Sequence, residues 1–475
     1  MKPDETLEQF IRFEAEQEFF KLKINDINYW HYIRFFFFMA ILEAKHGIIN
    51  RNNYQKNAKT TNNIIKQSDK FIFKNPLFVR HKDVLVFNHP RRIKQNNFYK
   101  CVYTDEWLKE CEFSYYVFEE PYLGTNLVPI KTKNIKYLDI NWYGKFINLK
   151  KSKLDYKTST PLSIIFNKLE IEFAIKFTNQ QKKNIAKTMN DQIANRDFLK
   201  KCYKHILKKI SPQVIILVVA YNFGHMMIIE TAKEMGIPTI ELEHGIIGKG
   251  HIAYNFAEKL NLESFPDYIF AFGKYDIDTP RYPINKKYII PVGSTELEMQ
   301  ALNYKNKIKK RNKKVITFLS DGTTELMQCA AELSKIIDNL ELEIIIKLHP
   351  SEYANWRKIY PFLLNTKIQV ADDSNHNIYY YLAVSDFVVG CASTTMYEAT
   401  IFDTEILIFK SGQYYRSAAL VENNMAIYVS SAEEIIEYII EPNNIKKLKK
   451  QNYFFCNNSK KLIYDAIKSI LAERK

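Results

Sequence analysis

The sequence predicts an α/β protein with two doubly wound parallel sheets and a helical extension at the N-terminus. Between residues 214 and 294, short apolar runs of strand type alternate with a helical pattern and are joined by short connections. Such connections favour parallel strands. The same alternation returns between residues 314 and 409, and doubly wound sheets are the common architecture with this pattern. A chain of 475 residues is long enough for two domains.

The first 48 residues are expected to be helical. Apolar positions with helical spacing are Leu7, Phe10, Ile11 and Phe13. The aromatic run Trp30–Phe38 is expected to lie in the core, because clustered phenylalanines are normally buried; an apolar contact with a membrane surface is the alternative. Residues 49–80 are polar and predict a loop or a frayed helix pair.

Strands and helices are then expected in the following order. The first region has strands within 82–90, 113–120, 135–140, 214–220, 237–244, 268–273 and 288–294, and helices within 162–210 and 224–236. The second has strands within 314–322, 342–350, 367–373, 386–393 and 404–410, and helices within 323–338, 377–385 and 394–402. We expect four parts: a helical extension 1–80, an N-terminal domain 81–302, a C-terminal domain 303–443 and a basic helix 444–475.

The charge balance favours anionic partners. The net charge is +15 and the pI about 9.1, which suits nucleic acid, acidic lipid or phosphorylated substrates. A nucleic-acid-binding protein is one competing interpretation, but neither aromatic–basic interleaving nor a known binding motif supports it, so we expect no nucleic acid as partner.

The spacing of the cysteines and the first residues of the chain indicate the cellular compartment in which the protein is expected. None of the six cysteines forms a CxxC pair, which argues against a zinc site or a disulfide framework and for a reducing compartment. The start, MKPDETLEQF, does not resemble a secretory signal. The most apolar run, Phe35–Leu42, is far shorter than the roughly 20 residues of a membrane span. We therefore expect a cytoplasmic protein.

Polar and small residues gather where expected strands end. In open α/β sheets, ligands bind beyond these carboxyl ends. The four stretches are Glu243-His244-Gly245, Ser320-Asp321-Gly322, His349-Pro350-Ser351-Glu352, and Gly390-Cys391-Ala392-Ser393-Thr394-Thr395.

The stretch that ends at Thr395 leads into a helix with Glu398 in its first turn. Ser393, Thr394 or Thr395 can serve as N-cap in a capping-box arrangement. The same geometry exposes backbone N–H groups that bind phosphate. His349 ends another strand of the same expected sheet, either as a packed turn residue or as a further phosphate ligand.

Residues 238–256, PTIELEHGIIGKGHIAYNF, place Gly245, Gly248 and Gly250 between His244 and His251. Glycines there form a tight turn or let the backbone approach a ligand. An imidazole is the usual general base near neutral pH, and metal binding by the two histidines alone is the less favoured interpretation.

Taken together, KLHPSE, the 43 positions from Pro350 to Ser393, and SDFVVGCASTTMYEATIFDTEILIF resemble the donor-binding half of GT-B glycosyltransferases. The likeness is greatest to the bacterial capsule and teichoic-acid group, which includes sialyl-, Kdo- and polyol-phosphate transferases. ELEHGIIGKGHIAY is similar to the HG segment of their first domain. The acidic-acidic-Gly motif of sialyltransferases is absent at its expected distance, and Pro and Lys do not follow the HG. The sheet pattern is also similar to that of UDP-N-acetylglucosamine 2-epimerases.

The resemblance implies two Rossmann-like domains that face a cleft, a nucleotide-sugar donor, no cofactor and no metal. The implied product is a bacterial capsule or lipopolysaccharide O-chain, with a teichoic-acid type polyol-phosphate transferase and a UDP-sugar 2-epimerase as alternatives. The expected catalytic residues are His244 as base, Glu243 and Asp321. The expected donor-binding residues are Gly322, His349, Pro350, Ser393, Thr394, Thr395 and Glu398, and the expected acceptor-binding residues are Lys249 and His251.

A lipid-linked glycan acceptor would place the protein at the inner face of the cytoplasmic membrane. Basic residues near an anionic surface contribute about 1 kcal/mol each, screened by salt. We therefore expect peripheral membrane binding through two basic groups. They are Lys305, Lys307, Lys309, Lys310, Arg311, Lys313 and Lys314, and in the tail Lys446, Lys447, Lys449 and Lys450.

Overall fold

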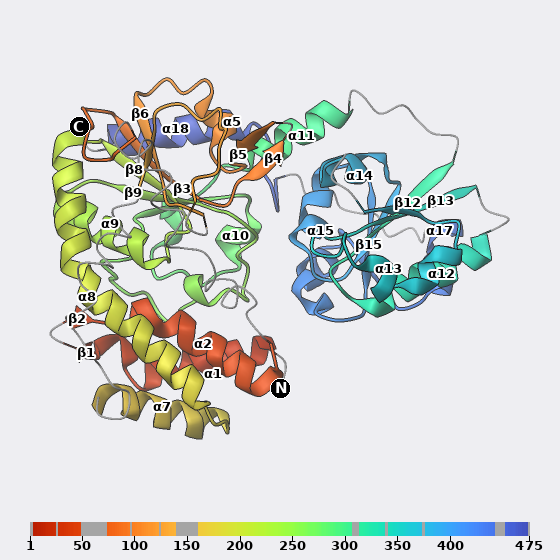
Figure 1. Cartoon of the computed structure of the whole chain (residues 1–475), viewed down its shortest axis with the longest axis horizontal. Helices are drawn as coiled ribbons and strands as arrows, with labels where there is room; N and C mark the ends of the chain where they lie inside the picture. Colours follow the sequence, from red (N-terminus) through yellow and green to blue (C-terminus); the bar gives the residue numbers. More distant parts are fainter. Residues whose placement is uncertain are drawn as a thin grey trace. The chain divides into compact units, whose positions relative to one another are not determined.

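The computed structural model describes residues 3–24, 27–48, 74–95, 97–122, 125–138, 160–305, 313–337, 341–372, 376–441 and 452–473. The chain forms two compact units (Figure 1). The first comprises residues 1–271, 275–291 and 460–475, and the second residues 272–274 and 292–459. Of the described helices, none is long and apolar enough to cross a membrane.

The first unit is built on a parallel seven-stranded sheet in the order β11-β10-β9-β8-β3-β6-β7. Its central strands are rich in β-branched residues and buried on both faces, as helices covering a parallel sheet require. The strands are β3 (Val84–Asn88), β6 (Tyr115–Glu119), β7 (Ile135–Tyr137), β8 (Val214–Val218), β9 (Thr239–Leu242), β10 (Tyr268–Ala271) and β11 (Ile289–Pro291). Two short antiparallel hairpins add β1 (Lys23–Ile24) with β2 (Ile27–Asn28), and β4 (Ile93–Gln95) with β5 (Phe98–Lys100).

Where one helical stretch was expected within residues 162–210, the structure has two helices, α7 (Thr160–Phe173) and α8 (Asn179–Ile210). The break has a local cause. Thr178 caps α8 and forms a capping box with Gln181, which starts a new helix. The other helices of this unit are α1 (Pro3–Glu16), α2 (Trp30–His46), α5 (Asp105–Leu108), α9 (Phe223–Glu234), α10 (Tyr275–Asp278) and α18 (Ser459–Ala472), with the 3₁₀ turn η3 (Ile252–Tyr254).

The N-terminal helices share a core with the first sheet. Phe10, Trp30 and Phe37 belong to the same apolar cluster as side chains of β3, β8 and α9. Trp30 is 1% exposed and Phe37 fully buried, whereas Phe36 is 37% exposed. The expectation that this aromatic run is core is confirmed, and its alternative assignment to a membrane contact is wrong.

The second unit is built on a parallel six-stranded sheet in the order β14-β13-β12-β15-β16-β17. Its strands are β12 (Lys314–Leu319), β13 (Leu342–Lys347), β14 (Gln369–Ala371), β15 (Phe387–Gly390), β16 (Glu405–Phe409) and β17 (Ile427–Val429). Its helices are α11 (Thr295–Lys305), α12 (Thr324–Ile336), α13 (Trp356–Ile359), α14 (Ile378–Val384), α15 (Thr394–Glu398), α16 (Ala418–Glu422) and α17 (Ala432–Ile440). The sequence analysis missed β17, β4 and β5. It also expected residues 1–48 to be helical, whereas β1 and β2 form a short hairpin there.

The C-terminal residues do not form a separate part of the structure. Residues 460–475 belong to the first unit, where Tyr464 donates a hydrogen bond to the carbonyl of Trp107. Most of the basic residues considered for membrane binding lie outside the described residues. They are Lys307, Lys309, Lys310, Arg311, Lys446, Lys447, Lys449 and Lys450.

Candidate functional site

The carboxyl ends of three neighbouring strands in the first unit carry the residues of greatest chemical interest. Strands β9, β8 and β3 are adjacent, and they are followed by His244, Tyr221 and His89 respectively. Tyr221 lies beside His244, with ring centroids 5.8 Å apart. Tyr103 lies near both histidines, with centroid distances of 5.9 Å to His89 and 6.4 Å to His244.

His244 is half-buried and weakly hydrogen-bonded. Its Nε2 is 3.4 Å from the Tyr221 hydroxyl, and its buried Nδ1 has no hydrogen-bond partner among the described residues. Burial, followed by the charges of His251 and His89, lowers the pKa of His244 to about 3. The imidazole is therefore unprotonated at neutral pH, the state in which it can accept a proton.

The loop after His244 is held by a buried carboxylate. Asp276 Oδ1 accepts hydrogen bonds from the N–H groups of Ile247, at 3.0 Å, and Gly248, at 3.1 Å. Gly248 has φ +52°, and a Cβ there would lie 2.9 Å from the Tyr275 hydroxyl. Gly245 meets no such obstacle. The structure thus requires glycine at position 248 for backbone reasons and makes no such demand at position 245.

Glu243 contacts the aspartate that holds this loop. Its side chain is 2% exposed and interacts with Asp276. Burial raises the pKa of Asp276 to about 7. Two buried carboxyl groups in contact are stable when they share a proton. The contact of Glu243 with Asp276 is consistent with a structural role for Glu243 in this loop.

His251 closes the same loop. Its Nδ1 accepts the N–H of Ala253 at 3.3 Å, and its ring lies against those of Tyr254 and Tyr221 at interplanar angles of 60°, with centroids 4.9 and 5.3 Å away. Lys249, the other expected acceptor ligand, is exposed. Asn255 ties the loop together, because its side-chain amide donates to the carbonyls of Gly248, at 3.0 Å, and His251, at 2.9 Å.

The turn after β8 contains a strained residue. Val219 has φ +66°, a region that β-branched residues avoid. Its carbonyl accepts hydrogen bonds from His225 Nδ1, at 3.0 Å, and Asn222 Nδ2, at 3.1 Å. Such strain persists where several contacts enforce it and is common at ligand sites. Here it lies two residues before Tyr221.

His89 and Tyr103 were missed by the sequence analysis as site residues. A signal was present, since Asn88-His89-Pro90 follows a buried strand in the same way as Leu348-His349-Pro350. What singles out His89 is the strand order, which places β3 next to β8. The chain reaches β8 only after more than a hundred further residues.

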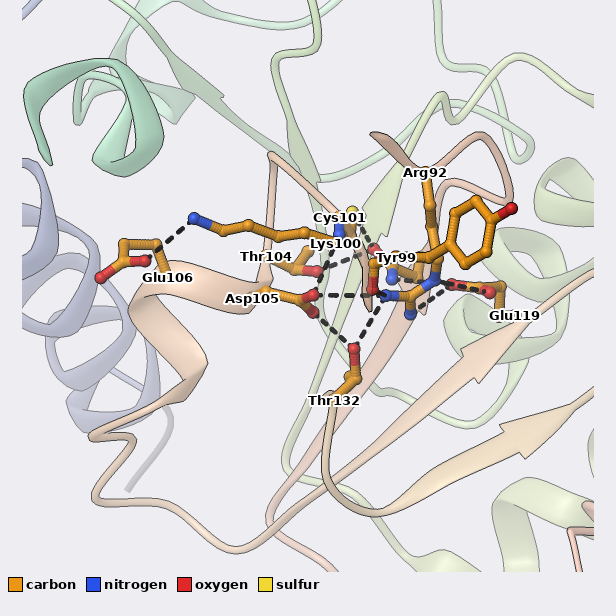
Figure 2. Close-up of polar contacts among 10 residues, drawn as sticks. Arg92, Tyr99, Lys100, Cys101, Thr104, Asp105, Glu106, Glu119 and Thr132 are labelled. Carbon is orange, nitrogen blue, oxygen red and sulfur yellow. Dashed lines mark hydrogen bonds and ion pairs between the residues drawn. The ribbon is translucent and has the colours of Figure 1, made fainter. Parts of the chain in front are cut away.

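The segment that carries His89 and Tyr103 is anchored by a buried arginine (Figure 2). Arg92 forms an ion pair with Glu119 at 2.7 Å and another with Asp105 at 3.2 Å, and its side chain is fully buried. It also donates to Thr132 Oγ1 at 2.9 Å. Arg92 therefore links the segment after β3 to β6 and α5.

Asn88 anchors the segment on its other side. It donates to Glu119 at 2.9 Å and accepts hydrogen bonds from the Cys101 thiol and the Thr104 hydroxyl, both at 2.8 Å. Burial raises the pKa of the Cys101 thiol to about 11, so this cysteine is a structural hydrogen-bond donor.

In the second unit, three expected ligand-binding turns come to one edge of the sheet. Strand β12 lies between β13 and β15, so the turns at Ser320, His349 and Ser393 are neighbours. Glu352 joins two of them. It accepts hydrogen bonds from the hydroxyl of Ser320 and the N–H of His349, each at 2.9 Å.

His349 is exposed, as is Pro350. Its Nδ1 accepts the N–H of Ser351 at 3.2 Å, which assigns the ring proton to Nε2. The nearby Asp321 and Gly322 are also exposed. Asp321 Oδ1 accepts the N–H of Thr323 at 3.2 Å, and Gly322 has φ +91°, so this turn needs glycine.

Ser393 is the N-cap of α15, and its hydroxyl accepts the N–H of Thr395 at 3.2 Å. Of the two threonines that follow, Thr394 is exposed and Thr395 half-buried. Glu398 forms no capping-box bond to this cap. It is half-buried, and desolvation raises its pKa to about 7.

Comparison with known proteins identifies the fold. No protein-family model matches the chain, and no curated protein matches it. A putative UDP-N-acetylglucosamine 2-epimerase from Listeria monocytogenes is 12% identical, with 82% of this chain and 97% of that chain covered and a TM-score of 0.51. The UDP-GlcNAc 2-epimerase from Methanocaldococcus jannaschii is 13% identical, covering 81% and 99%, with a TM-score of 0.49. The wall teichoic acid polymerase TagF is also 13% identical, covering 90% and 99%, with a TM-score of 0.41.

At these identities the likeness concerns the fold alone. The two parallel sheets with their helices are two Rossmann-like domains of the GT-B type, preceded by N-terminal helices. The expected fold class is confirmed.

Proposed function

We propose that this protein is a metal-independent glycosyltransferase that uses a nucleotide-sugar donor to extend a bacterial surface polysaccharide, such as a capsule or a lipopolysaccharide O-chain. The observation that carries the proposal is His244, an unprotonated imidazole at the ends of parallel strands, whose Nε2 has only a long contact of 3.4 Å to the Tyr221 hydroxyl. The donor is assigned to the second unit and the acceptor to the first.

In this reaction His244 Nε2 takes the proton of an acceptor hydroxyl. The hydroxyl oxygen then bonds to the anomeric carbon of the donor sugar while the bond from that carbon to the nucleotide phosphate breaks. The transition state resembles an oxocarbenium ion. Because the pKa of His244 is low in the free protein, bound ligand must raise it for proton transfer to be efficient. Lys249 and His251 are assigned to the acceptor. Glu243 and Asp321 remain the other catalytic candidates.

The donor phosphates are assigned to the neighbouring turns of the second unit. His349 offers an exposed Nε2–H, Gly322 allows close backbone approach, and Ser393, Thr394 and Thr395 offer hydroxyl groups. Pro350 and Glu398 complete this set, with Pro350 limiting the conformations of the histidine turn.

A UDP-sugar 2-epimerase is the second candidate. The observation that favours it is the fold likeness to the Listeria monocytogenes protein, at a TM-score of 0.51. An epimerase converts a nucleotide sugar without any acceptor, so product analysis separates the two functions. A polyol-phosphate transferase of the teichoic-acid type would need an acceptor but would transfer a phosphodiester-linked polyol rather than a sugar.

The first experiment is a thermal-shift panel of CMP, CDP, UDP and GDP, repeated with His349→Ala. A nucleotide at about 100 times its dissociation constant adds roughly 2.7 kcal/mol to stability. We expect one of the four to stabilise the wild type and to lose affinity in the variant. Absence of a shift with all four would contradict the assignment of the second unit.

The second experiment uses the nucleotide sugar that the panel identifies. We incubate it with the protein, with and without a polysaccharide acceptor, and identify the products by mass spectrometry. A glycosyltransferase lengthens the acceptor. Conversion of the donor sugar to its 2-epimer without acceptor would establish the alternative instead.

A further inference from the structure

The segment between β3 and α5, residues 89–104, has a feature that the proposed reaction does not yet use. It places His89 and Tyr103 at the same edge of the sheet as His244. Tyr103 meets the two imidazoles edge-on, with interplanar angles of 68° to His89 and 81° to His244. A positive charge on His89 lowers the pKa of His244.

The tautomer of His89 follows from its local contacts. Its Nδ1 accepts the backbone N–H of Arg91 at 3.0 Å, and the proton of the neutral ring therefore sits on Nε2. No residue of the described part of the chain accepts a hydrogen bond from this Nε2. The ring is half-buried and can be reached from solvent.

The charge state of His89 limits the ligand class. Burial is the largest cause that lowers the pKa of His89, so at neutral pH it presents a neutral N–H donor rather than a cation. A neutral donor suits the hydroxyl of a sugar or polyol, whereas a diphosphate is bound better by charged groups. Tyr103 and Tyr221 place aromatic rings beside His244 at this edge of the sheet, and aromatic rings are suited to contact the apolar side of a sugar.

The backbone around His89 is rigid on both sides. Asn88 is bonded to Glu119, Cys101 and Thr104, and Arg92 to Glu119, Asp105 and Thr132 (Figure 2). Each of these anchors is buried. A segment pinned within one residue of His89 on one side and three on the other holds the imidazole in place before ligand arrives, which reduces the entropic cost of binding.

We propose that His89 is an acceptor-binding residue whose Nε2–H donates to a hydroxyl group of the sugar or polyol that His244 deprotonates, with Arg92 as its positioning residue. The part that involves His244 rests on the proposed function. The binding role of His89 toward an uncharged carbohydrate does not, and it can be tested separately.

The binding test uses the full chain with ¹³C,¹⁵N-labelled histidine, and it assigns the His89 signals by their absence in His89→Gln. N-acetylglucosamine and inorganic phosphate are added separately to the wild type. We expect N-acetylglucosamine to shift the His89 signals and phosphate to leave them in place. A shift with phosphate, or none with either probe, overturns the proposal.

The kinetic test compares two substitutions with a control near the opposite end of the same strand. His89→Phe keeps the ring volume and removes the donor, while His89→Gln keeps an N–H near the position of Nε2. We expect His89→Phe to raise the acceptor KM about tenfold, the effect of one lost hydrogen bond, and His89→Gln to restore most of it. His81→Gln, three residues before the first residue of β3, should match the wild type.

The two tests separate failure of the inference from failure of the proposed function. If the protein transfers a sugar and folded His89→Phe has an unchanged acceptor KM, the inference is wrong and the function stands. If no nucleotide sugar is turned over, the proposed function falls, and the histidine spectra alone decide whether His89 binds carbohydrate. Should His89→Phe not fold, the comparison is made with His89→Gln and Arg92→Lys, the latter expected to raise acceptor KM without changing nucleotide affinity.

Discussion

Buried carboxyl groups beside the candidate site illustrate how burial sets protonation. Burial raises the pKa of both Asp276 and Glu241 to about 7, although each accepts hydrogen bonds that act in the opposite direction. Glu241 receives the Tyr254 hydroxyl at 2.5 Å and the N–H of Ala220 at 2.9 Å. At neutral pH each of these carboxyl groups is therefore partly protonated and partly ionised. Both accept hydrogen bonds from the loop that follows His244.

Asp276→Asn should flatten the dependence of stability on pH. The unfolded carboxyl titrates at 3.8, so between about pH 4 and 7 the folded state holds a proton that the unfolded state has lost. The free energy of unfolding therefore falls as pH rises through this window. An asparagine keeps the carbonyl acceptor for Ile247 and Gly248 and can donate to Glu243. Chemical unfolding at pH 5 and pH 8 measures how much the free energy of unfolding changes between these two pH values. In Asp276→Asn this change should be smaller than in the wild type, by on the order of a few kcal/mol.

Asp278→Asn is the matched control for this prediction. It changes an exposed carboxylate in the same short helix and should retain the full pH dependence. An equal flattening in both variants would show that the effect arises from general charge rather than from the buried pair.

His244→Ala should separate turnover from nucleotide binding. Loss of a general base typically reduces kcat by about 10²- to 10⁴-fold, while the nucleotide, assigned to the second unit, should bind as before. The check is a transfer assay beside a thermal shift with the nucleotide found in the panel. Retained activity would move the assignment to Asp321 or Glu243.

Among the elements, α2 holds the site loop through one buried side chain. Arg34 pairs with Glu14 of α1 and donates to the carbonyls of Ile252, at 2.5 Å, and Asn255, at 3.0 Å. Ile252 is the first residue of the 3₁₀ turn η3, and Asn255 directly follows its last residue. The first 48 residues are thus part of the scaffold of the candidate site.

Arg34→Lys should weaken the site more than the fold. Lysine keeps the charge but cannot reach two carbonyls and a carboxylate in one plane. Lost hydrogen bonds of this kind cost about 1–3 kcal/mol of unfolding free energy, and a shift of the loop by about 1 Å can lower kcat by up to 10²-fold. Thermal unfolding and the transfer assay measure the two effects.

Arg281→Lys is the control at this scale. Arg281 also joins α1 to the first unit, through Glu8 at 2.8 Å, but both side chains are about half exposed. Exposed pairs contribute about 0–1 kcal/mol, so stability and turnover should remain near wild type. Loss of turnover in this variant as large as in Arg34→Lys would show that any link to α1 suffices.

For the whole molecule, the net charge of +15 is the property that concerns partners. We propose peripheral binding to an anionic membrane, where a lipid-linked acceptor would be located. Flotation with vesicles of phosphatidylglycerol and phosphatidylcholine should recover the protein at low salt, and recovery should fall as salt screens the basic residues. Vesicles of phosphatidylcholine alone are the control. Absence of binding at low salt, or binding that high salt leaves unchanged, would refute the electrostatic interpretation.

The sequence by itself determined most of the strands and helices of the two sheets and the turns at their ends, although β4, β5 and β17 were not predicted. Val214–Val218 is apolar throughout, and Leu342–Lys347 is apolar apart from Glu343 and Lys347, because both faces of a parallel sheet are covered. This pattern can be recognised without a structure. His244 and His349, which follow β9 and β13, can be recognised in the same way. Local chemistry of this kind depends on neighbours along the chain.

Only the tertiary structure decided which of these turns lie together and what holds them. His89 and His244 both lie near Tyr103 because β3, β8 and β9 are neighbours in the sheet. Arg34 reaches the carbonyl of Ile252 across more than two hundred residues. Such pairings depend on the burial of whole elements against one another, and a single sequence carries no local signal for them. The same holds for Asp276, whose titration is set by burial and not by its neighbours in sequence.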